Sequence, residues 1–236
     1  MYDKSAALYD LFYDWKDYRA EAERVRQLVA DRNPHARTLL DVACGTGSHL
    51  VHFRDWYAVE GVDLNAGMLK VAATRLPGVV LHEADMRDFD IGRRFDVVTC
   101  LFSSIGYAES PEGLERAAAA IARHVAPSGV LIVEPWLTPE RFDLRSLGRV
   151  ILAERSDLQA VRMNGSRIEG NRSILDFHYL VARPGSVEHL TETHTMGLFT
   201  DDEYRSAFEG AGLSVEHDAD GLMGRGLWIG RRSGPS

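Results

Sequence analysis

The sequence predicts a doubly wound α/β protein that carries an antiparallel β insertion. Over the first 135 residues, short apolar runs alternate with segments of helical periodicity, which is typical of a parallel sheet with helices on both faces. A glycine-rich turn directly follows the first apolar run, at the place where such sheets bind nucleosides. From residue 136 the apolar residues alternate at period two, which indicates antiparallel strands.

Length and composition indicate one globular domain with a sizeable insertion. The chain has 236 residues, of which 45% are hydrophobic and 26% are charged, whereas a typical domain has ~100–150 residues. No apolar run approaches the ~18–20 residues of a membrane span, and the acidic, aromatic N-terminus is unlike a signal peptide. We therefore expect a cytoplasmic protein with no membrane partner.

Charge and cysteine content argue against two further classes of protein. The formal net charge of −8 argues against bulk nucleic-acid binding, which needs a basic surface. Cys44 and Cys100 both lie in apolar, strand-like contexts, so we interpret them as small core residues in a reducing compartment. They do not indicate a disulfide framework, and we expect no metal site.

The first part of the chain is expected to contain helices and five parallel strands. Ala22, Val25 and Leu28 recur at helical spacing, which predicts helix over the first ~35 residues. The expected strands are 38–43, 58–64, 79–85, 95–102 and 129–135. The expected helices lie near 48–55, 66–76 and 111–125, and the third opens with Pro111 after a Ser110 N-cap.

We expect three parts: a helical lid with the sheet core over 1–135, the insertion over 136–199, and a closing segment over 200–236. Four segments of the insertion alternate as strands do, namely 150–157, 158–167, 172–184 and 187–199. Asn164-Gly165 and Pro184-Gly185 are hairpin and turn signals. In the closing segment, Thr200 and Glu203 match a capping box that starts a helix over 200–212, before strands at 213–218 and 225–232.

Three predicted strand ends together indicate an adenosine site. Gly45 and Gly47 follow the first strand, where the lack of a Cβ allows a tight turn against a ligand. Asp63 ends the second strand, where a carboxylate can accept both hydroxyls of a ribose. Asp85 ends the third strand, where it could accept the adenine amino hydrogens while Met86 packs on the base. The turn lacks the third glycine of a pyrophosphate-binding loop, as expected for a nucleoside without phosphates.

Asp41-Val-Ala-Cys-Gly-Thr-Gly47, Asp63 and Ala84-Asp-Met86 resemble the first three motifs of class I S-adenosylmethionine-dependent methyltransferases. The resemblance implies a Rossmann-like methyltransferase sheet of seven strands, the last of them antiparallel, and S-adenosylmethionine as cofactor. The closing strand pair is consistent with that sheet.

Longer strings narrow the resemblance over nearly the whole chain. LYDLFY (8–13), DMRDF (85–89), FSSIGY (102–107), EPW (134–136) and GRGLWIG (224–230) resemble the N,N-dimethyltransferases of antibiotic deoxysugar biosynthesis. Those enzymes act on dTDP-linked 3-amino-dideoxyhexoses, as in desosamine and mycaminose pathways. The chain departs from the family at Leu137, where a second aromatic residue is common, and residues 138–165 match poorly.

The residues expected at the cofactor combine strand-end and lid positions. By resemblance, Lys16 and Tyr18 lie near the methionine carboxylate. The remaining cofactor residues are Asp41, Ala43, Gly45, Gly47, Asp63, Leu64, Met68, Asp85, Met86, Leu101 and Ser103.

The residues expected at the acceptor sugar nucleotide are aromatic, basic or polar. Arginine forks match phosphate oxygens, so Arg225, between two glycines, and Arg162 are candidates for the diphosphate. Trp136, just past the fifth strand, is placed to stack on thymine. Tyr107 is the candidate for orienting the amine, and by resemblance Tyr13 faces it. The other expected substrate contacts are Tyr9, Ser104 and His178, with His194 as a further candidate.

Transfer to an aminosugar nitrogen is expected to depend on alignment more than on a strong base. The amine loses a proton readily enough near neutral pH, and no His–carboxylate pair in the sequence demands a base role. Two methyl groups are expected in succession, and a homodimer is compatible with the sequence. Three alternatives stay open: another small amine or hydroxyl acceptor, a non-catalytic S-adenosylmethionine-binding protein, and an NAD-dependent oxidoreductase. The lack of a pyrophosphate-binding loop argues against the oxidoreductase.

Overall fold

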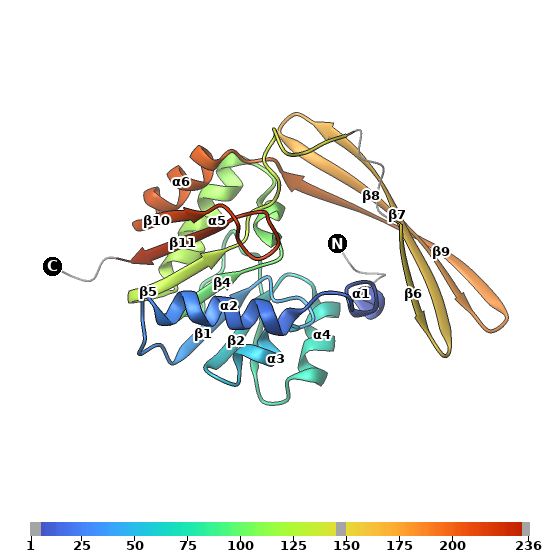
Figure 1. The fold of residues 1–236 in the computed structure, drawn as a ribbon, viewed down its shortest axis with the longest axis horizontal. Helices are drawn as coiled ribbons and strands as arrows, with labels where there is room; N and C mark the ends of the chain where they lie inside the picture. The colour runs from blue at the N-terminus through green and yellow to red at the C-terminus, as the bar shows by residue number, and fades with distance from the viewer. Residues whose placement is uncertain (1–5, 145–149, 233–236) are drawn as a thin grey trace.

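A seven-stranded, mostly parallel sheet forms the centre of the molecule (Figure 1). The computed structural model describes residues 6–144 and 150–232. The sheet has the order β10-β11-β5-β4-β1-β2-β3, and β11 runs antiparallel to both of its neighbours. The predicted doubly wound fold with one antiparallel closing strand is therefore confirmed. Its strands are β1 (Thr38–Val42), β2 (Ala58–Asp63), β3 (Val80–Glu83), β4 (Phe95–Cys100), β5 (Val125–Val133), β10 (Leu213–Asp218) and β11 (Leu227–Arg232).

Helices cover both faces of this sheet because its strands are apolar on both sides. Neighbouring strand residues point to opposite faces, so Leu39 packs with α2, α3 and α4 while Leu40 packs with α5 and α6. Such two-sided burial is the condition for a parallel sheet. The helices are α1 (Ala6–Phe12), α2 (Tyr18–Ala30), α3 (Leu50–Phe53), α4 (Ala66–Arg75), α5 (Pro111–Arg123) and α6 (Asp201–Gly210), with a 3₁₀ helix, η1 (Ser104–Ala108), after β4.

The predicted helix starts are confirmed by their caps. The Ser110 hydroxyl accepts a hydrogen bond from the Gly113 amide at 3.1 Å, with Pro111 in the first turn of α5. Thr200 and Glu203 form the full capping box of α6. Other boundaries differ from the prediction. The helical region over the first ~35 residues contains two helices, α1 and α2, and the helix near 48–55 is the short α3. Helix α5 ends at Arg123 and β5 starts four residues earlier than predicted, because the chain already pairs with β4 from Val125.

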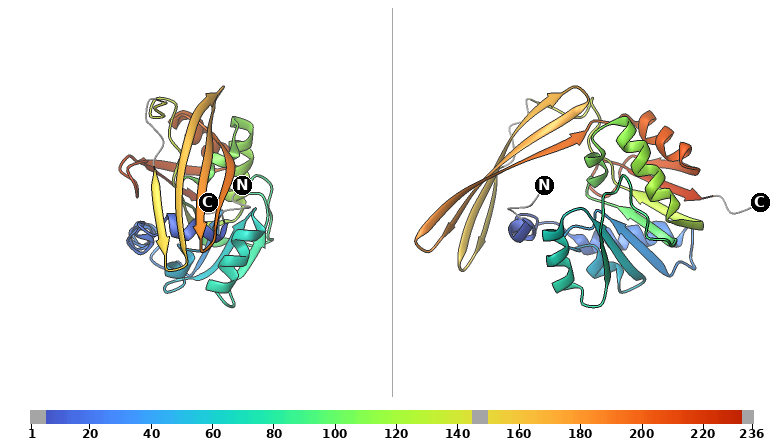
Figure 2. Two further views of the ribbon diagram at one scale, coloured as in Figure 1. Left: turned by 90° about the vertical axis from the view of Figure 1, so that its right-hand side faces the viewer. Right: turned by 180° about the vertical axis from the view of Figure 1, so that it is seen from behind.

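The four strands of the insertion form a long antiparallel sheet that projects from the core (Figure 2). They are β6 (Ile151–Arg155), β7 (Leu158–Glu169), β8 (Arg172–Arg183) and β9 (Ser186–Gly197). The turn at Pro184-Gly185 is confirmed, since Arg183 pairs with Ser186 across it.

The predicted turn at Asn164-Gly165 is wrong. Both residues lie inside β7, where Asn164 pairs with Phe177 and Gly165 with Asp176 of β8. The chain reverses five residues later, at Gly170, whose positive φ of 62° suits a tight turn. Continuous pairing along all of β8 overrides the local turn preference, because each added cross-strand pair contributes stability.

Helix α1 joins the two sheets (Figure 1). Leu8 and Phe12 of α1 pack into a cluster with Tyr179 of β8 and apolar residues of β7. On its other side, the Asp10 carboxylate accepts hydrogen bonds from the Thr46 hydroxyl at 2.6 Å and from Arg75 Nη2 at 2.5 Å. Helix α1 is therefore fixed between the glycine-rich turn, α4 and the second sheet, and the segment that follows it leads to α2.

Among the helices that the structure describes, none has the length and apolar character needed to cross a membrane.

The junction of η1 and α5 has no room for a side chain at Gly113, which gives a stability prediction. A Cβ added there would lie 2.0 Å from the Ala108 carbonyl oxygen, a backbone atom that already accepts from the Ser110 amide at 2.8 Å. We expect Gly113→Ala to lower the free energy of unfolding by about 1–3 kcal/mol, the usual cost of overpacking, as measured by urea denaturation.

The matched control is Gly210→Ala at the end of α6. A Cβ at Gly210 would meet no atom within 4 Å, so this variant should lose no stability and can gain at most about 1 kcal/mol from helix propensity. Equal midpoints for the two variants would contradict the steric explanation.

Candidate active site

The carboxyl ends of β1, β2, β3 and β4 meet at one edge of the main sheet, where ligands of such folds bind. The chain turns sharply there: Ala43 after β1 has φ 57°, and Phe102 and Ser103 after β4 have φ 54° and 61°. Left-handed backbone is costly for residues other than glycine and concentrates at functional sites. These two turns line two cavities that meet at this edge.

The first cavity, of about 350 Å³, contains the predicted adenosine residues. Asp63 is fixed by two backbone donors, since its oxygens accept from the Gly45 amide at 2.8 Å and the Asn65 amide at 2.8 Å. Burial raises the pKa of Asp63. A Cβ at Gly45 would meet nothing within 4 Å, so this face of the turn is open toward the cavity. Four further predicted residues line it, namely Ala43, Leu64, Met68 and Met86.

Asp85 lines the same cavity but already has a partner that the sequence analysis did not include. Its carboxylate accepts from Arg87 Nε at 3.0 Å and Nη2 at 2.6 Å, which lowers the pKa of Asp85. Two carboxylate oxygens offer about four acceptor positions, so a further donor can still be bound. The contact to an adenine amino group stays a prediction.

A narrow extension of this space is lined by Asp41, Gly45 and Leu101, with Tyr18 from α2. The Asp41 carboxylate accepts from the Thr99 hydroxyl at 2.7 Å, and burial raises the pKa of Asp41 to about 6. The Tyr18 hydroxyl is buried and has no hydrogen-bond partner within residues 6–144 and 150–232. A buried donor of this kind requires an acceptor, so the extension fits a ligand with a carboxylate and an amino group. Cys44 also lines it, and burial raises the pKa of that thiol.

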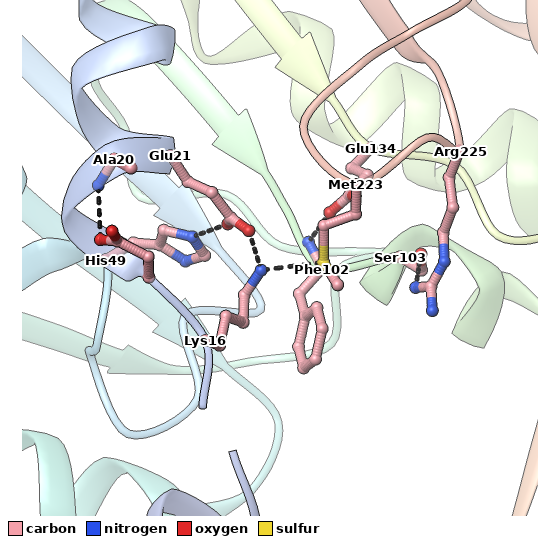
Figure 3. Close-up of polar contacts among 10 residues, drawn as sticks. Lys16, Ala20, Glu21, His49, Phe102, Ser103, Glu134, Met223 and Arg225 are labelled. Atoms are coloured by element: carbon pink, nitrogen blue, oxygen red, sulfur yellow. Dashed lines mark hydrogen bonds and ion pairs between the residues drawn. The ribbon is translucent and has the colours of Figure 1, made fainter. Parts of the chain in front are cut away.

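Lys16 lies beside this extension and lines neither cavity. Its ammonium is 4.4 Å from the centre of the Phe102 ring, donates to Met223 Sδ at 3.0 Å, and is paired with Glu21 (Figure 3). Glu21 also bonds His49 Nε2 at 2.8 Å. Burial acts to raise the pKa of Glu21, but its bonds to His49 and Lys16 outweigh burial and lower it. Lys16 therefore already has partners within the protein, and its contact with the cofactor stays a prediction.

Gly47 and Ser103, two other predicted cofactor residues, have roles in packing and hydrogen bonding within the protein. A Cβ at Gly47, whose φ is 76°, would lie 2.6 Å from Leu76 Cδ1, so this glycine permits the packing of α4. The Ser103 hydroxyl donates to the Pro135 carbonyl at 2.7 Å and accepts from Arg225 Nη1 at 2.7 Å (Figure 3). Gly47 thus serves packing, and the Ser103 hydroxyl is used inside the protein.

The second cavity, of about 760 Å³, lies between the main sheet and the insertion sheet. Tyr9, Ser104 and Tyr107 line both cavities and therefore mark where they meet. Tyr13 and Trp136 line the second cavity, and the Trp136 indole donates to the Ser173 hydroxyl of β8 at 2.9 Å.

Three arginines line this second cavity. Arg162 is 6% exposed, donates to the Tyr13 hydroxyl at 2.9 Å, and lies over the Phe177 ring at 4.7 Å. Arg225 lies over the Trp136 ring at 5.1 Å. Arg141 was not expected; it lies in a stretch without a clear pattern, and its Nη2 donates to the Gly224 carbonyl at 2.5 Å.

The two insertion histidines predicted as candidates differ in position: one lies away from both cavities, and the other lies beside a glutamate that was not predicted. His178 is exposed on the outer face of the sheet, where it stacks on His189, so it lines neither cavity and the predicted substrate contact is withdrawn. His194 lines the second cavity, and its Nδ1 is 2.9 Å from the Tyr107 hydroxyl. Glu192 faces the other nitrogen, with Oε2 3.8 Å from His194 Nε2. The i, i+2 spacing on one strand was the signal for this pair.

Glu134 is a further residue that the sequence analysis did not single out, although it begins the EPW string. The carboxylate is fully buried and accepts from the Phe102 amide at 2.7 Å (Figure 3). Burial raises the pKa of Glu134. It thereby holds the left-handed turn after β4.

Comparisons with known proteins agree with this geometry. The family profile described as methyltransferase domain matches residues 39–129. The chain is 44% identical to dTDP-3-amino-3,4,6-trideoxy-alpha-D-glucopyranose N,N-dimethyltransferase of Streptomyces venezuelae, over 95% of this chain and 96% of that protein. It is 45% identical to dTDP-3-amino-3,6-dideoxy-alpha-D-glucopyranose N,N-dimethyltransferase of Streptomyces fradiae, over 95% and 89%.

Solved structures show the same fold. The crystal structure of Streptomyces venezuelae DesVI superposes with a TM-score of 0.92 at 43% identity, covering 98% of this chain and 99% of that one. That of CalS10, an amino pentose methyltransferase from Micromonospora echinaspora solved with S-adenosylmethionine bound, gives 0.86 at 36% identity over 96% and 95%. S-adenosylmethionine is the cofactor of this chain, and Tyr18, Asp41, Gly45 and Asp63 are the residues whose geometry fits it. The chain belongs to the family of S-adenosylmethionine-dependent methyltransferases that includes these sugar N,N-dimethyltransferases.

Proposed function

We propose that this enzyme transfers two methyl groups in succession to the 3-amino group of a dTDP-linked aminodeoxysugar. The observation that carries the proposal is the meeting of two cavities at Tyr107: a nucleoside-type site on one side, and a larger site with three arginines on the other. The relatives that match nearly the whole chain have such sugar nucleotides in their names.

The second cavity suits an anionic sugar nucleotide although the protein as a whole is acidic. The chain has a net charge of −8, yet Arg141, Arg162 and Arg225 line this one space. Guanidinium groups bind phosphate oxygens in paired hydrogen bonds, and Trp136 supplies a flat apolar face for a pyrimidine. Arg141 donates a hydrogen bond to the carbonyl of Gly224, the residue before Arg225, so these two arginines lie in neighbouring segments and we assign the diphosphate to them. We assign the sugar to the deeper part of the cavity, near Arg162 and Tyr13.

The insertion acts as a substrate cap in this proposal. Residues of β7, β8 and β9 line the second cavity, and the indole of Trp136 is tied to β8 through Ser173. The cap sheet and the strand ends of the core together enclose the sugar nucleotide, so an acceptor must fit both.

The main task of the protein residues is to align the acceptor amine with the methyl group of the donor. When bound, S-adenosylmethionine supplies a methyl group on a positively charged sulfur that is its own leaving group. Tyr107 stands where the cavities meet and orients the amine, while Tyr9 and Ser104 complete the junction. Holding reacting groups in line can contribute roughly 7–11 kcal/mol toward the barrier.

The direct test is incubation with S-adenosylmethionine and a dTDP-linked 3-amino-dideoxyglucose, with products read by mass spectrometry. We expect gains of one and then two methyl masses on the sugar nucleotide. An unchanged sugar nucleotide beside bound cofactor would leave the acceptor as another small amine or hydroxyl. Binding of cofactor without methylation of any acceptor in a panel of amines and alcohols would indicate a non-catalytic protein.

The buried Asp41 predicts a pH dependence of cofactor affinity. With a pKa of about 6, Asp41 is ionised above that pH and can stabilise the ammonium of the methionine group. Affinity measured by calorimetry between pH 5 and 8 should therefore fall as the pH drops through about 6. Asp41→Asn should bind more weakly at pH 8 and lose most of this dependence.

Thr99→Val provides the matched control for Asp41. The variant removes the hydrogen bond that lowers the pKa of Asp41, so the inflection should move to higher pH. An affinity that stays constant between pH 5 and 8 in the unaltered protein would contradict the role of Asp41.

Arg225→Ala should weaken binding of the sugar nucleotide without weakening that of S-adenosylmethionine. Loss of a hydrogen bond to a charged group costs about 1.5–3 kcal/mol, so the Kd for dTDP should rise by roughly 10- to 150-fold. The control is Arg231→Ala on β11, the strand that follows Arg225, because Arg231 is exposed and lines neither cavity. Equal dTDP affinities for the two variants would place the diphosphate elsewhere.

A further inference from the structure

We infer that His194 is the proton acceptor of this enzyme and acts through Tyr107 on the amine of the acceptor. The inference rests on the proposed function and adds to it the route by which protons leave the nitrogen between the two methyl transfers. His194 is a positioning residue for Tyr107 as well, because it sets the direction of the hydrogen bond that Tyr107 makes.

The contact between the two residues is direct and enclosed. Tyr107 lies in η1 and His194 in β9, two elements that pack against each other. The Tyr107 oxygen is 2.9 Å from His194 Nδ1, and the imidazole is 1% exposed although it lines the second cavity. The Phe177 ring lies against the imidazole with centroids 4.8 Å apart, which fixes the ring orientation.

The neighbours of His194 determine which nitrogen bears hydrogen. Glu192 Oε2 lies 3.8 Å from Nε2, too far for a hydrogen bond, but its negative charge favours the tautomer with hydrogen on that nitrogen, which we take for the relay. Nδ1 is then an acceptor, and the Tyr107 hydroxyl donates to it. In the proposed relay the Tyr107 oxygen accepts an N–H from the substrate amine while its own hydrogen points to His194 Nδ1.

The charged and titratable groups around His194 come from several elements. Glu192 on β9 favours the imidazolium, and it also accepts from the Tyr179 hydroxyl of β8 at 3.4 Å. Arg162 on β7, over the shared Phe177 ring, opposes it. Tyr107 on η1 and Tyr9 and Tyr13 of the α1 segment line the same cavity. Its other ionisable lining residues are Arg141, Asp143 and Arg225.

Dimethylation gives this acceptor a necessary task. Methyl transfer to a neutral amine gives an ammonium, which has one N–H more than the neutral methylated amine and no lone pair for a second attack. Before the next attack, an N–H bond breaks and its proton joins the Tyr107 oxygen while the Tyr107 proton joins His194 Nδ1. The phenol is restored and the imidazolium forms beside Glu192. The imidazolium then releases its proton to water, so charge and protons balance in each round.

The variant that separates proton transfer from structure is His194→Asn. The asparagine oxygen can replace Nδ1 as the acceptor for Tyr107, but it cannot take up a proton. Removal of a proton acceptor typically lowers a rate by 10²- to 10⁴-fold, so we expect kcat to fall roughly 10²-fold with KM for the sugar nucleotide nearly unchanged. Monomethyl product should accumulate, and the pH profile of kcat should differ from that of the unaltered enzyme, because asparagine takes up no proton.

The matched control is His189→Asn. His189 lies on the same strand as His194, is exposed, and stacks on His178 on the outer face. It should show the rates, product ratio and pH profile of the unaltered enzyme. A second readout needs no turnover: in ¹⁵N NMR spectra of the imidazoles, Tyr107→Phe should shift the Nδ1 resonance of His194 and leave that of His189 in place.

The outcomes distinguish this inference from the proposed function. If the unaltered enzyme does not methylate the dTDP-linked aminosugar, the proposed function fails. If it does, and His194→Asn retains its kcat, product ratio and pH profile, the role of His194 fails while the proposed function stands. If Tyr107→Phe leaves the His194 Nδ1 resonance unchanged, the hydrogen bond on which the relay depends is absent in solution and the inference is overturned.

Discussion

The buried carboxylate of Glu134 stabilises the turn after β4, and the arrangement of both cavities depends on this turn. By accepting the Phe102 amide at 2.7 Å, it stabilises a left-handed turn that residues other than glycine rarely adopt. The next residue, Ser103, is bonded to both the Pro135 carbonyl and Arg225. The turn then directs η1 so that Tyr107 stands between the cofactor space and the acceptor space. One short segment after β4 thus positions the reacting amine and the arginine that we assign to the diphosphate.

The two sheets divide the work of binding. The parallel sheet supplies fixed backbone donors and strand-end carboxylates, which suit a nucleoside, and the antiparallel sheet supplies a wall of aromatic and basic side chains. Helix α1 connects them through Asp10 on the cofactor side and Phe12 on the insertion side. Contact between Lys16 and Met223 further links the segment after α1 to the turn that carries Arg225. Movement of α1 would therefore disturb both cavities together.

Sequence reasoning was most successful where local patterns determine structure. Buried strands, Ser110 and the Thr200–Glu203 box are defined by their near neighbours, so the core was predictable. Asn164-Gly165 shows the limit, because pairing along the whole of β8 is a long-range effect that outweighs a two-residue preference. The histidines show another limit: His178 and His194 lie on different strands, and alternation alone could place either imidazole outward. Lys16 and Arg141 depend on contacts with residues some 80 to 200 positions away, which no local pattern reveals.

The burial of Cys44 bears on chemical selectivity. A methyl donor with a sulfonium centre is an alkylating agent, and sulfur nucleophiles in its vicinity compete with the amine. Cys44 lines the narrow extension of the cofactor cavity, but burial and the nearby carboxylates of Asp41 and Asp63 raise the pKa of its thiol. Since the thiolate is the reactive form, this sulfur stays inert at neutral pH. The acidic strand ends that recognise the cofactor thus also protect the enzyme from methylating itself.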